Sequence, residues 1–219
     1  MYRLIRGERN VAAIIKLKVV DLYQGDRVSS FSKAADFGIW GIIHKATTGA
    51  TGRDGKYSDR RLAALDAGLL WGAYHWGTNA NVSKQVDNFL KNAKPDDRTL
   101  MALDYEDARM SLSQAREFLT LLAEQLGRKP VLYSGNLIKE RLGNKVDAFF
   151  GSHRLWLAQY GPNPKVQKSW KKYWLWQYTD RKTGLKPNEV PGLPGDSKGN
   201  LDCDSYEGTQ TQLKAEWAS

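Results

Sequence analysis

Short apolar runs that alternate with helix-like segments constrain the fold of this chain most strongly. Seven runs have the length and the β-branched and aromatic residues typical of buried strands. They lie at residues 14–21, 37–46, 69–76, 99–106, 129–134, 154–160 and 172–178. Repeated strand–helix units predict a mostly parallel sheet that is covered by helices.

Two of the intervening segments carry clear helix signals. In residues 81–93, apolar side chains recur at helical spacing. In residues 111–127, Ser111 and Gln114 form a capping-box pattern and Gly127 supplies the stop signal. The expected buried stripe of the second helix consists of Ala115, Phe118, Leu119, Leu122 and Leu126.

The number of strands and the missing motifs favour a barrel over an open sheet. The chain has 219 residues, enough for one domain, and it lacks a dinucleotide glycine fingerprint and a phosphate-binding loop. We therefore expect an α/β fold, an irregular β/α (TIM-like) barrel in a single domain. The expected divisions are an N-terminal leader with the start of the first strand (1–18), the main domain (19–208) and a short polar C-terminal tail (209–219).

Polar residues stand where several of the predicted strands end, which is where β/α barrels place their chemistry. The most telling pair is Asp104 and Glu106, because alternation along a strand points both side chains to the same face. Like charge and partial burial raise the pKa of at least one of two such carboxyl groups, so that it can act as a general acid. Glycoside hydrolysis uses this chemistry. The D-x-E pattern alone is more often a solvated loop entry or a salt-bridged pair than a catalytic site.

Cysteine, histidine and charge content narrow the function further. A single cysteine, Cys203, and three histidines without zinc-like spacing predict neither a disulfide framework nor a metal site. The formal net charge of +9 and the lysine-rich residues 165–174 suggest a polyanionic partner. Because no nucleic-acid-binding motif is present, we expect an anionic surface rather than nucleic acid, with a solvated basic face as the alternative.

Polar residues also interrupt the apolar part of the N-terminal stretch. Glu8, Asn10, Lys16 and Lys18 break any apolar core that a signal peptide would need. We expect no secretory signal and no stable membrane insertion.

Seven short motifs, in order, resemble those of family 25 glycoside hydrolases, the muramidases common among bacterial and phage lysozymes. They are VVDLYQG (19–25), IIHKATTG (42–49), AGLLWGAYHW (67–76), MALDYE (101–106), LWLAQYG (155–161), WLWQYT (174–179) and LDCDSYEG (201–208). The resemblance implies an irregular β/α barrel that cleaves the β-1,4 bond between N-acetylmuramic acid and N-acetylglucosamine without a metal or organic cofactor.

The resemblance also implies roles for individual residues. Glu106 matches the proton donor, and Asp104 matches its partner carboxylate. Asp21 and Asp202 match the other two acidic residues of the groove. Asp204 is an alternative to Asp202, although a turn or capping aspartate explains it better.

Further residues are expected to contact the substrate along the groove. They are Lys45, Tyr74, His75, Tyr133, Trp156, Tyr160, Gln177 and Tyr178. Each aromatic residue taken alone is more often part of a hydrophobic core, and a histidine at a strand end, such as His75, is at least as often a hydrogen-bonded core residue.

Two motifs depart from the family pattern. Thr48 stands where the family usually has an acidic residue, and Leu22 and Tyr23 follow Asp21 where other residues are commoner. Neither change touches the D-x-E pair, so we expect them to affect substrate preference rather than activity.

The expected partners follow from the same resemblance. We expect a monomer that acts on bacterial peptidoglycan at the cell wall, with the basic surface replacing the wall-binding repeats often found in the family. The expected source is a phage endolysin released from the host cytoplasm by a membrane-permeabilising protein. The alternatives are a non-catalytic glycan-binding module on the same barrel and a chitinase-like enzyme, whose longer series of alternating aspartates this chain lacks.

Overall fold

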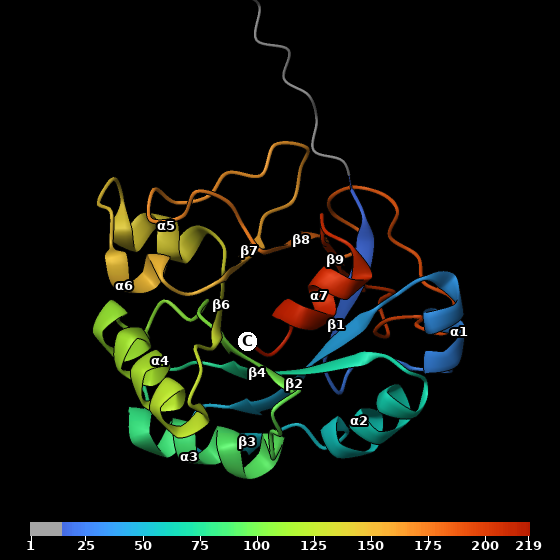
Figure 1. The fold of residues 1–219 in the computed structure, drawn as a ribbon, viewed down its shortest axis with the longest axis horizontal. Coiled ribbons are helices and arrows are strands. Elements are labelled where there is room, and N and C mark those ends of the chain that lie inside the picture. Colours follow the sequence, from blue (N-terminus) through green and yellow to red (C-terminus); the bar gives the residue numbers. More distant parts are fainter. Residues whose placement is uncertain (1–14) are drawn as a thin grey trace, which may run out of the picture.

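Strands pair side by side until the sheet closes on itself in the computed structural model, which describes residues 15–219 (Figure 1). Within these residues, eight strands form the closed ring in a single α/β domain. The ring runs β1 (Leu17–Leu22), β2 (Gly41–Thr48), β4 (Leu70–Trp76), β5 (Leu100–Asp104), β6 (Val131–Ser134), β7 (Leu155–Ala158), β8 (Leu175–Thr179) and β9 (Asp202–Ser205), and β9 pairs back onto β1. The predicted irregular β/α barrel is confirmed.

The irregularity lies where the ring closes. Neighbouring strands from β1 to β8 are parallel, whereas β9 is antiparallel to both β8 and β1. A two-residue strand, β3 (Gly52–Arg53), forms a hairpin with the end of β2. The residues of β9 read Asp-Cys-Asp-Ser, so no apolar run marked this strand in the sequence.

Helices cover the outside of the barrel (Figure 1). They are α1 (Phe31–Phe37), α2 (Tyr57–Asp66), α3 (Val82–Ala93), α4 (Leu112–Leu126), α5 (Asn136–Leu142) and the short α6 (Ala148–Gly151). The predicted signals of α4 are confirmed: Ser111 and Gln114 form a reciprocal capping box, and Gly127 ends the helix with φ of 67°.

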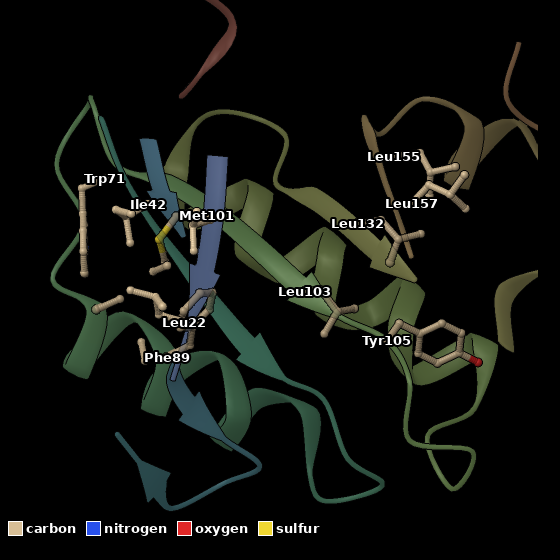
Figure 2. Close-up of a cluster of buried hydrophobic side chains, with 14 of the residues drawn as sticks. Leu22, Ile42, Trp71, Phe89, Met101, Leu103, Tyr105, Leu132, Leu155 and Leu157 are labelled. Atoms are coloured by element: carbon tan, nitrogen blue, oxygen red, sulfur yellow. The ribbon is translucent and has the colours of Figure 1, made fainter. Parts of the chain in front are cut away.

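Alternation along each strand divides the apolar side chains between two cores. Outward-facing residues such as Leu22, Met101 and Leu132 pack in the layer between strands and helices (Figure 2). Inward-facing residues such as Val19, Ile43 and Leu100 fill the barrel. A position's parity along its strand therefore decides whether a polar residue there can reach the barrel interior.

Residues 209–219, expected to be a short polar tail, contain a helix that packs against the inner core of the barrel. Thr209 and Gln212 make a second capping box at the start of α7 (Gln210–Glu216). Leu213 and Trp217 are buried in the inner core, and the Trp217 indole N–H donates to the Trp71 carbonyl at 2.7 Å. A helix with one narrow apolar face looks polar in sequence, which is why these residues carried no helix signal.

At the other end of the chain, Leu17 and Lys18 belong to β1, while most of the predicted leader, residues 1–14, lies outside the described residues.

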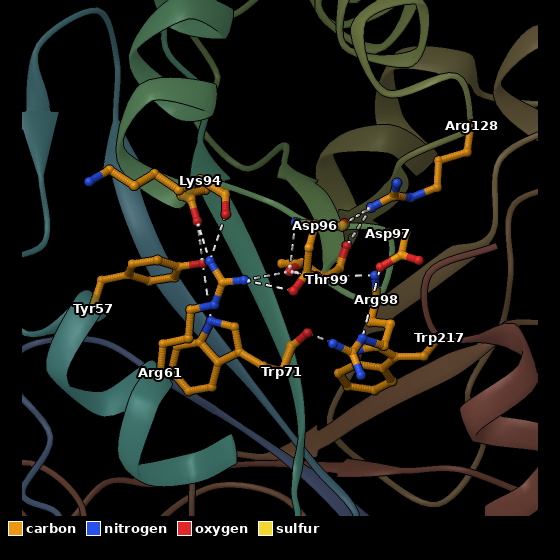
Figure 3. Close-up of polar contacts among 11 residues, drawn as sticks. Tyr57, Arg61, Trp71, Lys94, Asp96, Asp97, Arg98, Thr99, Arg128 and Trp217 are labelled. Atoms are coloured by element: carbon orange, nitrogen blue, oxygen red, sulfur yellow. Dashed lines mark hydrogen bonds and ion pairs between the residues drawn. The ribbon is translucent and has the colours of Figure 1, made fainter. Parts of the chain in front are cut away.

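A polar cluster fixes the turn that leads into β5 (Figure 3). Arg61 of α2 donates to the carbonyl groups of Ala93 and Lys94 and to the Asp96 carboxylate, and Arg128 donates to the carbonyl groups of Asp96 and Thr99. These bonds set the start of the strand whose far end carries Asp104.

Candidate active site

A pocket of about 600 Å³ opens at the carboxyl ends of the strands. Nine of the residues expected to act there line it: Asp21, Tyr74, Asp104, Glu106, Tyr133, Trp156, Tyr160, Gln177 and Asp202. Most of them share the inward parity of their strands. The barrel thus brings together in space side chains from β1, β4, β5, β6, β7, β8 and β9.

Asp104 and Glu106 occupy different environments although they are two residues apart. Asp104 is the last residue of β5 and is buried, and its Oδ1 has no hydrogen-bond partner within residues 15–219. Glu106 follows the strand and its side chain is exposed on the rim of the pocket. One carboxyl group therefore lies in the wall while the other faces incoming solute.

Both groups hold protons more tightly than a free carboxylate. Burial, and then the charge of Glu106, raise the pKa of Asp104 well above its usual value. The surrounding pocket wall removes water from the Glu106 carboxylate, and this desolvation raises the pKa of Glu106 as well. The Lys45 ammonium opposes both shifts, because a nearby positive charge favours the ionised form.

Asp21 and Asp202 form the opposite side of the acidic pocket. They are directly paired across β1 and β9, which places their side chains on the same face of the sheet. The Gln177 side-chain amide donates from Nε2 to Asp21 Oδ2 at 2.9 Å. Its side-chain oxygen, Oε1, accepts from the hydroxyl groups of Tyr133 at 2.9 Å and Tyr160 at 3.3 Å. Burial, and then the charge of Asp21, raise the pKa of Asp202 to about 9.

Asp204 lies deeper in the barrel than the pocket-lining acids. It is fully buried, and the Trp156 indole N–H donates to its Oδ1 at 2.6 Å. It belongs to β9 and is neither a turn nor a capping residue, so that expectation is wrong. Of the two alternatives, Asp202 is the one that lines the pocket.

Aromatic rings form the floor and one wall. Trp156 packs edge-on against Tyr133, with ring centroids 4.4 Å apart, and against Tyr74 at 6.2 Å. The Lys45 ammonium lies over the rings of Tyr23, Tyr74 and Trp76 at 4.9–5.7 Å. Lys45 therefore sits beside the pocket and acts on it through its charge.

Two expected groove residues point the other way. His75 is buried between the barrel and the helices, where it bonds to Thr47 and Gln85 and stacks on Phe118. Tyr178 packs against Trp176 on the outside, and its hydroxyl donates to the Pro187 carbonyl. Neither side chain lines the pocket, for the same reason: these positions are one residue out of step with the inward-facing Tyr74 and Gln177.

Sequence reasoning missed several lining residues. Trp76 shares the parity of Tyr74 at the end of β4, so the alternation rule could have found it. Asn136 and Leu137, in the first turn of α5, carried no signal of their own because their place depends on how the helix docks.

The lysine-rich segment separates by residue type. Lys165, Lys168, Lys171 and Lys172 are exposed, whereas Trp170 is buried and its indole N–H donates to the His153 carbonyl at 2.8 Å. The tryptophan is thus part of the core and does not alternate with the lysines on a binding face.

Two kinds of feature are absent from residues 15–219. No group of three or more His, Cys, Asp or Glu side chains has an arrangement suited to a metal ion. Among the helices described, none has both the length and the apolar character needed to cross a membrane.

Known proteins share this fold. The chain is 27% identical to a family GH25 lysozyme from Aspergillus fumigatus, with a TM-score of 0.74 over 93% of this chain and 99% of that one. It shares its fold with the lysozyme of Streptomyces coelicolor, at 24% identity and a TM-score of 0.78 over 92% and 97% of the two chains.

In sequence, the chain is 26% identical over 178 residues to the uncharacterized protein YegX of Escherichia coli. That match covers 78% of this chain, which spans 60% of the length of this relative. The model of glycosyl hydrolases family 25 matches residues 20–185, and the chain belongs to this family.

Proposed function

We propose that the protein is a muramidase that hydrolyses the β-1,4 bond between N-acetylmuramic acid and N-acetylglucosamine in peptidoglycan. Membership of family 25 supports a peptidoglycan hydrolase. The observation that carries the finer proposal is the unequal pair at the end of β5: a buried Asp104 with an unpartnered oxygen, and an exposed Glu106 on the pocket rim. In this mechanism Glu106 protonates the leaving oxygen, and Asp104 accepts a hydrogen bond from the substrate.

Substrate binding moves the proton of this pair to where it is needed. In the free protein, burial makes Asp104 the stronger holder of a proton. An N–H group of the substrate, such as that of an acetamido group, that donates to Asp104 Oδ1 stabilises the ionised form of Asp104. A sugar that covers the rim removes water from Glu106 and raises the pKa of Glu106 further. Glu106 then carries the proton that general acid catalysis requires.

Asp104, once the substrate has stabilised its ionised form, supplies negative charge beside the positive centre that develops at the sugar, and Asp21 and Asp202 line the opposite side of the pocket. Preorganised charge in a water-poor pocket is effective because it needs no rearrangement during the reaction. The rings of Tyr74, Tyr133, Trp156 and Tyr160 offer surfaces for sugar faces. No metal or organic cofactor takes part in this mechanism.

The wider setting is part of the same proposal. The protein acts as a monomer at the bacterial cell wall, attracted to an anionic surface by its net charge of +9. A membrane-permeabilising partner releases it from the host cytoplasm, in the manner of an endolysin. Nucleic acid is not a partner.

The test is to incubate the purified protein with peptidoglycan and to identify the newly released reducing-end sugar. N-acetylmuramic acid at the new reducing end is the expected product. Release of N-acetylglucosamine ends would contradict the assigned bond. Binding to walls without any new reducing ends would replace the proposal with the alternative, a non-catalytic peptidoglycan-binding module.

A further inference from the structure

One buried carboxyl group in the barrel has no part in the mechanism above. Asp204 lies beneath the pocket with none of its surface exposed, and it accepts the Trp156 indole N–H at 2.6 Å. Its second oxygen, Oδ2, is buried without a hydrogen-bond partner within the described residues. A buried acceptor without a hydrogen bond lowers the stability of the fold, so a proton is needed at this oxygen.

The missing donor is a proton held between two carboxyl groups. Asp21 lies close to Asp204: Asp204 is paired with Val19, two residues before Asp21 on the same face of β1, and with Gln177, whose side chain donates to Asp21 Oδ2 at 2.9 Å. Two adjacent buried carboxylates repel one another, whereas a carboxyl–carboxylate pair with one proton forms a hydrogen bond. Burial is the largest cause that raises the pKa of both groups, and for Asp21 the charge of Asp204 comes next.

We propose that Asp204 is a positioning residue that shares one proton with Asp21 and anchors Trp156, so that the acidic side and the aromatic floor of the pocket keep a fixed geometry. This inference rests on the proposed function for its effect on catalysis. The shared proton itself does not depend on that function.

Trp156 carries the anchor into the pocket. Its ring packs against Tyr133, whose hydroxyl donates to Gln177, and Gln177 in turn donates to Asp21. Hydrogen bonds and one ring contact therefore connect Asp204 through Trp156, Tyr133 and Gln177 to Asp21, and the shared proton completes the circuit. Loss of one carboxyl group at the base loosens both walls.

Other titratable groups surround the pair, and their contribution to the pH dependence of stability must be separated from that of the shared proton. They are Asp26 after β1, Lys45 on β2, Tyr74 on β4, Asp104 and Glu106 at β5, Tyr133 on β6, Tyr160 and Tyr178 at β7 and β8, and Asp202 and Cys203 on β9. Comparing variants of Asp204 with the wild type removes their shared contribution.

The first experiment measures the proton directly. Asp204→Asn keeps an acceptor for Trp156 and offers a permanent N–H donor to Asp21, so Asp21 can ionise without a shared proton. The wild type holds a proton in the folded state that the unfolded chain releases above about pH 4, so its stability falls as pH rises. Denaturant unfolding between pH 5 and pH 8 should show about one proton fewer linked to folding in Asp204→Asn.

Cys203→Ala is the matched control, because Cys203 is buried in the same strand but belongs to the outer core. Its pH dependence should equal that of the wild type. Equal proton linkage in the wild type and Asp204→Asn would overturn the shared proton.

The second experiment measures positioning through kcat/KM for reducing-end release. Asp204→Leu removes both bonds and should lower kcat/KM about tenfold to a hundredfold, the range expected for losing a buried hydrogen bond to a charged group. Asp204→Asn should recover most of this loss and should move the alkaline limb of the pH profile upward, because it has no proton to lose. Wild-type kcat/KM in Asp204→Leu, or equal losses in the leucine and asparagine variants, would overturn the positioning role.

Trp156→Phe covers the case in which the leucine variant does not fold. It keeps a ring and removes the N–H donor, so it should lower kcat/KM as well, and wild-type kcat/KM would contradict the anchor. If the wild type itself releases no reducing ends, the proposed function fails, and the linkage experiment still decides whether Asp21 and Asp204 share a proton.

Discussion

Replacing Glu106 with glutamine removes one ionisable proton from the pocket and changes little else. The amide keeps the size of the side chain, and the position is exposed on the rim, so no buried contact is lost. Glutamine cannot protonate a departing sugar oxygen. General acid catalysis is typically worth about 10² to 10⁴ in rate, and we expect kcat to fall by that factor.

The same substitution, Glu106→Gln, should not lower the stability of the fold. The pKa of Glu106 is raised in the folded protein, so the folded state resists its ionisation above the usual pKa of a glutamate. Removing that group relieves repulsion with Asp104 and should leave the melting temperature equal to or slightly above that of the wild type at neutral pH. Loss of activity and loss of fold are thus separable.

The assay follows turbidity of a wall suspension together with reducing ends, and thermal melting of each variant. Asp107→Asn is the matched control: it removes a carboxylate one residue away that bonds to Arg109 and lies outside the residues lining the pocket. It should lyse walls at the wild-type rate. If Glu106→Gln melts like the wild type and also lyses walls at a near wild-type rate, Glu106 is not the acid and the mechanism is wrong.

Four further outcomes can be checked with the same preparations. Asp104→Asn should also slow lysis, by weakening charge stabilisation and by lowering the pKa of Glu106 in the substrate complex, where Asp104 is otherwise ionised, and the alkaline limb of the pH–rate profile should move to lower pH. Asp202→Asn should make unfolding less dependent on pH: the folded pKa of about 9 exceeds the usual 3.8, so the wild type loses up to about 1.4 kcal/mol of stability per pH unit across that window, and denaturant titrations at several pH values measure the difference. Adsorption to walls should weaken steeply with salt, because the Debye length shortens from about 10 Å at 0.1 M to about 3 Å at 1 M, and unchanged binding in a pull-down would indicate groove contacts instead. Chelator should leave lysis unchanged, and a complete loss that added metal restores would show that a metal takes part.

The parts of the fold that depend on local pattern were predictable from sequence. Helix α4 begins at the capping box of Ser111 and Gln114 and ends at Gly127, so its limits depend only on residues within that segment. The apolar strands are likewise recognisable from their own hydrophobic runs. Neither strand β9 nor the buried position of Trp217 could be predicted from the sequence. Asp202, Asp204 and Trp217 are buried by partners that lie far away in the chain.

The candidate site was predictable to the extent that strand parity was respected. Asp104 and Glu106 were paired by alternation, whereas His75 and Tyr178 were chosen for residue type and a matching motif. Applying the same alternation to β4 would have replaced His75 with Trp76. The docking of α5, which brings Asn136 to the pocket, follows no short-range rule.

The antiparallel strand that closes the barrel also decides when the pocket can exist during folding. Lys16 and Ser205, 189 positions apart, are hydrogen-bonded at this closure, and Asp21 meets Asp202 in the same step. Contacts this distant in sequence cost the most loop entropy and form late. A ribosome-bound chain that has not yet emerged beyond β8 therefore has half of its acidic wall missing. The complete acidic pocket therefore forms only when β9 pairs with both β1 and β8.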